Sequence, residues 1–216
     1  MNNYYFKIIT TFLIFFIIIY NYPVKADLPL QGKVIVVDSG HGGLDPGAIY
    51  KDIYEKDITL AIGKYLQKYL SELGATVIMT RNSDSDLSKG VKNHRKKADF
   101  DERIKIINKE YVDMYVSIHL NYLTDTKYYG AQVFYNKDNK RLAESIQNYL
   151  NENTNTDRKI KQIPSSTYMY DLLTTKGVLV ECGFLSNSME RSKLISKEYQ
   201  IEFANKLARA ISYYYN

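Results

Sequence analysis

Apolar and polar positions along the chain follow two different periods. Short apolar runs typical of buried strands occur at residues 33–38, 75–80, 113–119, 130–136 and 176–182. Across residues 55–73 the spacing changes, and Ile58, Ile62 and Leu66 recur four residues apart. This spacing predicts a helix, and Gly74 follows it as a stop signal.

Three more segments have the spacing of helices. They are residues 100–110, residues 139–153 and the last 20 residues, where Ile201, Ala204, Leu207 and Ile211 share one face. Residues 81–97 are polar and are predicted to form a long loop. The alternation of strands and helices predicts an α/β fold: a single domain with a largely parallel twisted sheet, flanked by helices.

The first 26 residues have a different composition from the rest. One lysine near the start is followed by an apolar run from Ile8 to Tyr20, and Val24 and Ala26 are the small residues of a cleavage site. The run is short compared with the ~20 residues that span a bilayer. We expect residues 1–26 to be a signal peptide cleaved after Ala26, with an uncleaved membrane anchor as the alternative. The chain is then exported, and residues 27–216 form one domain.

Charge and cysteine content exclude several classes of protein. The formal net charge is +5, and loss of Lys7 and Lys25 with the leader lowers it by two. The most basic stretch, residues 89–100, is predicted to be solvated, and no nucleic-acid-binding motif occurs, so we expect no nucleic-acid partner. Cys182 is the only cysteine, which excludes an internal disulfide.

Chemically active side chains follow three of the predicted strands. His41 lies among glycines in "DSGHGG" after the first strand, His119 ends "YVSIH", and Glu181 follows "GVLV". Ligands of open α/β sheets bind beyond the carboxyl ends of the strands, so these residues are expected to converge on one edge. Glu55, at the start of the first helix, can reach the same edge.

Two histidines and a carboxylate are a common ligand set of catalytic zinc, and a second carboxylate there is the expected general base. Other interpretations stay open at this stage. Each histidine alone can be an ordinary loop residue, and Glu181 can belong to a buried ion pair. Arg81 is expected to pair with an acid and Cys182 to be a buried, inert thiol.

The chain resembles the zinc-dependent N-acetylmuramoyl-L-alanine amidases of the type 3 family. The motifs "DSGHGGLDPGA", "EKDITLAI", "TRNSD", "ERIKIIN", "VDMYVSIHLN" and "VLVECGFLSN" occur in family order over nearly the whole exported chain. The resemblance implies that His41, Glu55 and His119 bind Zn²⁺ and that Glu181 is the catalytic acid/base. The segment "IYKDIY" before Glu55 departs from the glycine-rich form common in the family, so the shape of the cleft near Glu55 is an open question.

The family implies hydrolysis of the amide between N-acetylmuramic acid and the L-alanine of the stem peptide of peptidoglycan. Within it, the chain resembles most the short members of spore-forming bacteria, which act on the cortex on the way to muramic lactam. Two alternatives are a zinc carboxypeptidase or endopeptidase acting on the stem peptide, and a wall-binding module with a vestigial site. The 21 tyrosines, in a chain without tryptophan, raise the hypothesis that some of them bind glycan or an activating protein partner. The alternative is that they occupy ordinary core and surface positions.

Overall fold

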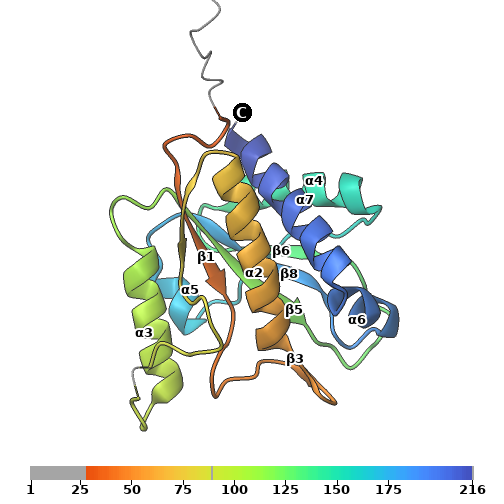
Figure 1. Ribbon diagram of the computed structural model, residues 1–216, viewed down its shortest axis with the longest axis horizontal. Coiled ribbons are helices and arrows are strands. Elements are labelled where there is room, and N and C mark those ends of the chain that lie inside the picture. Colours follow the sequence, from red (N-terminus) through yellow and green to blue (C-terminus); the bar gives the residue numbers. More distant parts are fainter. Residues whose placement is uncertain (1–27, 89, 216) are drawn as a thin grey trace, which may run out of the picture.

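The computed structural model describes residues 28–88 and 90–215 (Figure 1). The predicted leader, residues 1–26, lies outside them. The strands are β1 (Val34–Ser39), β2 (Ile49–Tyr50), β3 (Ile53–Tyr54), β4 (Thr76–Met79), β5 (Met114–Asn121), β6 (Gln132–Tyr135), β7 (Lys161–Gln162) and β8 (Gly177–Phe184). The helices are α2 (Glu55–Glu72), α3 (Arg95–Ile107), α4 (Lys140–Thr154), α5 (Tyr168–Leu172), α6 (Ser188–Leu194) and α7 (Lys197–Tyr215).

The main sheet has the strand order β4-β1-β5-β8-β6-β7. Strands β4, β1, β5 and β8 are mutually parallel, whereas β6 runs antiparallel to β8. β2 and β3 form a separate antiparallel hairpin. The predicted α/β domain with a largely parallel sheet is confirmed, and the carboxyl ends of β1, β5 and β8 meet at one edge.

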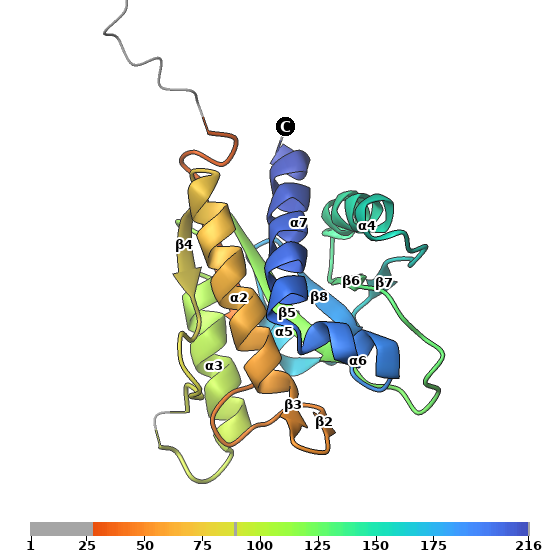
Figure 2. The ribbon, with the colours of Figure 1, turned by 45° about the vertical axis from the view of Figure 1, so that its right-hand side comes forward.

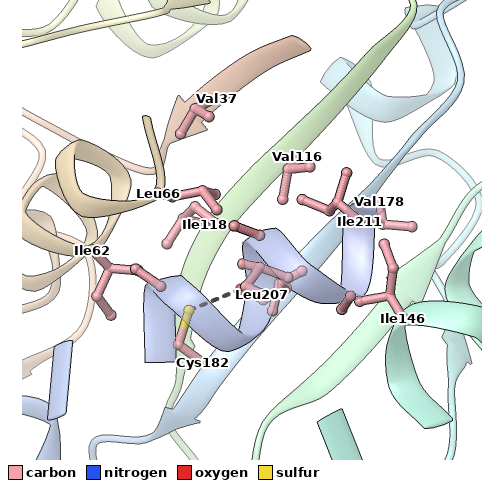
Figure 3. Packing of buried hydrophobic residues seen from close by; sticks show 14 of the residues in the cluster. Val37, Ile62, Leu66, Val116, Ile118, Ile146, Val178, Cys182, Leu207 and Ile211 are labelled. Carbon is pink, nitrogen blue, oxygen red and sulfur yellow. Dashed lines mark hydrogen bonds between the residues drawn. The ribbon is translucent and has the colours of Figure 1, made fainter. Parts of the chain in front are cut away.

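One face of the sheet is covered by α2, α4 and α7, as Figures 1 and 2 show. Their apolar sides meet a continuous core, in which Ile62, Leu66, Leu207 and Ile211 are fully buried against the strands (Figure 3). These are the positions whose spacing predicted helices. Burial of such a side chain contributes about 1.5–3 kcal/mol, so this face supplies most of the packing energy.

Within residues 28–88 and 90–215, the helices that cover the opposite face are α3 and the five-residue α5. Its apolar cluster is smaller and includes Val36, Ile107 and Tyr115. Near the carboxyl ends of the strands this cluster gives way to buried polar groups, among them Asp38, Ser117 and Arg103. This partly covered face leaves the end of the sheet open for a site.

Some elements were not predicted. The stretch between the first motif and Glu55 forms the β2–β3 hairpin, and α5, α6 and β7 are too short to show a period. Helix α3 begins at Arg95, inside the stretch predicted as loop, because Asp99 accepts from the Leu87 amide and pairs with Arg103 one turn later. These long-range contacts order the start of the helix.

Both ends of the described chain lie at the same end of the sheet (Figure 1). Leu30 lies just before β1, and its amide donates to the Leu73 carbonyl. The Lys33 ammonium lies 5.1 Å from the ring centre of Tyr215 at the end of α7. The carboxyl ends of the parallel strands point away from this region. Within the described residues, no helix has the length and apolar character needed to cross a membrane.

Candidate metal centre and the neighbouring carboxylate

Three of the residues singled out from the sequence meet at the carboxyl edge of the sheet. His41, Glu55 and His119 each offer one atom to a group of donors that all lie within 4.8 Å of one another. Glu55 Oε1 lies 3.2 Å from His41 Nε2 and 3.1 Å from His119 Nδ1. The two imidazole rings stand at 81° with their centres 5.0 Å apart. The three side chains therefore face a common point.

His41 is held in an unusual backbone conformation directly after β1. Its φ is 61°, in the left-handed region that costs most residues energy. Asp45 Oδ2 accepts a hydrogen bond at 3.0 Å from His41 Nδ1, which orients the ring so that Nε2 faces Glu55. A carboxylate on the outer nitrogen is the usual support of a metal-binding imidazole.

Two buried arginines hold the loop that carries His41. Arg103 donates to the carbonyls of His41 (2.7 Å) and Ser39 (2.8 Å) and pairs with Asp38 at 2.7 Å. Arg81 donates to the carbonyls of Ser39 and Gly40. The sequence predicted an acid as the structural partner of Arg81. Its hydrogen bonds go instead to carbonyls and Thr59, while the charges of Asp38, Asp84 and Asp99 act on it without a hydrogen bond.

Glu55 enters the site at the first position of α2. The β2–β3 hairpin brings Glu55 back beside Ala48, the residue that precedes the hairpin, and the Glu55 amide donates to the Ala48 carbonyl. The carboxylate is almost fully buried and accepts from the amides of Ala48 and Leu120. The "IYKDIY" segment, despite its unusual sequence, thus delivers Glu55 to the cluster in a fixed orientation.

Two glycines leave room for the ligand side chains. A Cβ on Gly40 would lie 2.4 Å from the ring of His119, and one on Gly47 would lie 2.6 Å from Glu55 Oε2. Both contacts are too short for any other residue. The glycines around His41 therefore serve the close approach that the sequence suggested.

Glu181 lies beside the cluster on the next strand. It is the direct neighbour of His119 in the β5–β8 register, so both side chains point to the same face of the sheet. Its Oε2 is buried without a hydrogen-bond partner among the described residues. Burial, together with the nearby Glu55 carboxylate, raises the pKa of Glu181 to about 8, in the range suited to general acid/base chemistry.

The charges of the cluster favour a cation. Burial alone would lower the pKa of His41, but hydrogen bonds to Asp45 and Glu55 raise it to about 9. Burial alone would raise the pKa of Glu55, yet hydrogen bonds from His119 and His41 hold it well below its usual range. The negative charges of Glu55 and Asp45 thus stabilise a positive charge at this position, whether on a histidine or on a metal ion.

The donor set fits zinc. Two imidazoles and one carboxylate, with a fourth position left for water, are a known catalytic zinc set, bound at about 2.0–2.2 Å. The cluster supplies those atoms within reach of one ion, and the unpaired Glu181 carboxylate stands beside it without belonging to the group of three. Among the described residues no cysteine joins them, as a structural zinc site would require.

Two other residues considered from the sequence lie away from this chemistry. His94 is exposed and precedes α3. Cys182 is fully buried in the core on the α7 side of β8, and burial raises the pKa of its thiol well above the usual value (Figure 3). A protonated, enclosed thiol is a poor nucleophile, as the sequence analysis expected.

Comparison with known proteins identifies relatives of the whole described domain. The sequence pattern of the N-acetylmuramoyl-L-alanine amidase family matches residues 35–213. The germination-specific N-acetylmuramoyl-L-alanine amidase of Bacillus subtilis (strain 168) is 43% identical over 195 residues, which cover 87% of this chain and 82% of the relative.

Solved structures agree with this result. The CwlD amidase from Clostridioides difficile, in complex with the GerS lipoprotein, superposes with a TM-score of 0.74 at 38% identity, covering 84% of this chain and 95% of that one. The catalytic domain of the N-acetylmuramoyl-L-alanine amidase CwlV from Bacillus (Paenibacillus) polymyxa has a TM-score of 0.69 at 27% identity, with coverages of 84% and 95%. The resemblance drawn from the sequence motifs is confirmed: the chain belongs to the N-acetylmuramoyl-L-alanine amidase family.

Proposed function

We propose that this chain hydrolyses the amide between N-acetylmuramic acid and L-alanine in cortex peptidoglycan. His41, Glu55 and His119 hold a zinc ion, and Glu181 is the catalytic acid/base. The observation that carries the proposal is the Glu181 carboxylate next to the three gathered donors, with its Oε2 buried and without a hydrogen-bond partner among the described residues. Zinc, when bound, supplies Lewis-acid chemistry: it polarises a carbonyl and lowers the pKa of water.

The protein groups divide the work of the reaction. Glu181 takes a proton from the attacking water and delivers it to the leaving amine of L-alanine, a transfer typically worth ~10²- to 10⁴-fold in rate. Asp45 and the backbone-bound Glu55 keep the donors oriented, so little reorganisation accompanies the reaction. Arg81 and Arg103 fix the loop on which His41 depends.

The cortex assignment rests on relatives. The Bacillus subtilis protein named as germination-specific covers most of this chain. An apolar segment at the start of the sequence supports export, and we place the protein outside the cytoplasm, in the cell wall or the forespore intermembrane space.

A protein partner is part of the proposal. The Clostridioides difficile relative was solved in complex with a lipoprotein. This chain carries exposed tyrosines near the carboxyl edge of the sheet, Tyr122 and Tyr129, which suit an interface with a protein that activates it. Equal turnover with and without cell-envelope extract would argue against such a partner.

The function is tested with purified, zinc-loaded protein and cortex peptidoglycan. Mass spectrometry of the products should show intact stem peptides with a free L-alanine amino group, and glycan without peptide. Shortened peptides would identify a peptidase instead. Absence of any cleavage by the zinc-loaded protein, with a family amidase active in parallel, would favour a wall-binding module.

A further inference from the structure

Arg158 is a charged side chain whose guanidinium forms no ion pair within the described part of the chain. It lies just before β7, and no acidic residue of the described chain forms an ion pair with it. Its Nη2 donates to the neutral Gln132 side chain at 2.8 Å. Its Nε is buried without a hydrogen-bond partner. Removing a guanidinium partly from water without a hydrogen-bond partner for each donor costs free energy, unless a bound ligand accepts the remaining hydrogen bonds.

Aromatic rings hold this guanidinium in place. Its central carbon lies 5.1 Å from the ring centre of Phe184 and 5.7 Å from that of Tyr128. Phe184 is fully buried, and the backbone of Arg158 is tied to Asn151 through two hydrogen bonds. The side chain is thus ordered by the fold, in the manner of a binding residue, rather than free in solvent.

The position of Arg158 relative to Glu181 follows from the sheet. Gln132 is the direct antiparallel neighbour of Glu181, so their side chains share a face about 5 Å apart. Arg158 bonds to the far end of Gln132. Across the strand order β1-β5-β8-β6-β7 the groups therefore follow one line: the donors, then Glu181, then Gln132, then Arg158.

This line gives the substrate a direction, on the basis of the function proposed above. Glu181 protonates the leaving amine, so the stem peptide departs on the side of Glu181 away from the donors. We propose that Arg158 binds a carboxylate of the stem peptide beyond L-alanine. The carboxylate would pair directly with the guanidinium and accept from Nη1, which has no protein partner among the described residues and is not an enclosed atom.

The test compares two substrates within each enzyme. N-acetylmuramoyl-L-alanyl-D-glutamate and its diamide differ only in charge at the peptide end, and the ratio of their kcat/KM values does not depend on how much of a variant is folded. The zinc-loaded wild type should favour the carboxylate about 10-fold or more, the size expected for hydrogen bonds to a charged group. In Arg158→Gln the ratio should fall close to one, mainly through KM.

Two further variants sharpen the result. Arg158→Lys keeps the charge without the planar fork and should retain an intermediate preference. Arg209→Gln makes the same chemical change on an exposed part of α7 and should preserve the wild-type ratio. Binding of the free dipeptide L-alanyl-D-glutamate, measured by calorimetry, should weaken strongly in Arg158→Gln, partly in Arg158→Lys and not at all in Arg209→Gln.

Failure of this inference is distinct from failure of the proposed function. If the wild type releases stem peptides from cortex peptidoglycan but shows no preference between the two small substrates, Arg158 does not bind the carboxylate. Retention of the wild-type ratio by Arg158→Gln leads to the same conclusion. If the wild type releases no stem peptide at all, the proposed function itself is wrong.

Discussion

The two faces of the central sheet are built by different means. The face under α2, α4 and α7 is a continuous apolar core, in which Leu66 and Leu207 are typical fully buried members. The face under α3 and α5 has a smaller apolar cluster, and near the site it relies on buried charge, with Arg103 between Asp38 and Asp99.

The difference teaches where each kind of interaction is useful. Apolar packing stabilises the fold without requiring a defined orientation of any single atom. It supports the sheet on the face under α2, α4 and α7, opposite to the candidate site. Hydrogen bonds between charged groups require defined directions. On the face under α3 and α5 they fix the loop that carries His41. Substitutions on one face should therefore change stability, and those at the site should change metal binding or turnover.

The largest expected effect is at a donor. His119→Ala removes one of three proposed ligands while the apolar core stays intact. Zinc per chain, measured by elemental analysis, should fall far below the wild-type value, activity should be lost, and the urea midpoint of the metal-free protein should change little. His94→Ala, an exposed histidine, should keep both metal and activity. Full zinc occupancy in His119→Ala would exclude His119 as a ligand.

A core substitution should lower stability and leave turnover unchanged, the reverse of the effect expected at a donor. Leu207→Ala removes a fully buried side chain from α7 and should lower the free energy of unfolding by about 2–5 kcal/mol. Urea unfolding measures this loss, with the exposed Tyr213→Ala on the same helix as control. Turnover per folded molecule should stay at the wild-type value. A large fall in kcat of the folded fraction would show that the two faces are coupled.

Glu181→Gln separates chemistry from metal binding. The change keeps the volume and the position next to His119 but removes the base, so kcat should fall by about 10²-fold or more with little change in KM. Zinc content should match the wild type, as should that of Glu202→Gln on exposed α7. Loss of zinc would instead make Glu181 a ligand, and Glu55 would become the candidate base.

The smallest effect concerns acid stability on the polar face. Burial alone would raise the pKa of Asp38, but the charge of Arg103 and hydrogen bonds from Ser117 and others outweigh it and hold the pKa below its ordinary value. Such a carboxylate contributes stability above the unfolded pKa of about 4, and this contribution is lost as the pH falls through the lower folded pKa.

Ser117→Ala removes one of these hydrogen bonds, given by Ser117 to Asp38 at 2.7 Å. It should cost about 1–3 kcal/mol at pH 7 and shift the acid limb of stability to higher pH, because the folded pKa of Asp38 rises. Urea unfolding from pH 7 down to pH 3 measures both, with Ser192→Ala on exposed α6 as control. An unchanged acid limb would mean that Ser117 does not hold the Asp38 charge.

Much of the fold could be predicted because the period of apolar residues reports burial directly. The confirmed helices α2 and α7 show this, since Ile62 and Leu207 lie in the core. Hairpin β2–β3 and helix α5 could not be predicted, because a few residues contain no full period and contacts with distant segments decide their shape.

The candidate site could be predicted only in part. Parallel strands bring their carboxyl ends together, so His41, His119 and Glu181 were expected at one edge, and the structure brings them there; their roles stay predictions. Arg103 was missed because it lies in a polar helix turn and its partner Asp38 is 65 residues away in sequence. Arg158 lies in a stretch without period, and only the fold shows that its Nε is buried without a hydrogen-bond partner among the described residues.

The shared location of the two chain ends has a practical consequence. Tyr215 at the end of α7 lies next to Lys33, just ahead of β1, while the donors gather where β1 and β5 finish. An attachment at either end of residues 28–215 therefore lies away from the donors. Immobilised on a bead or sensor through an attachment beyond Tyr215, the protein would present the donors outward to large, insoluble wall fragments.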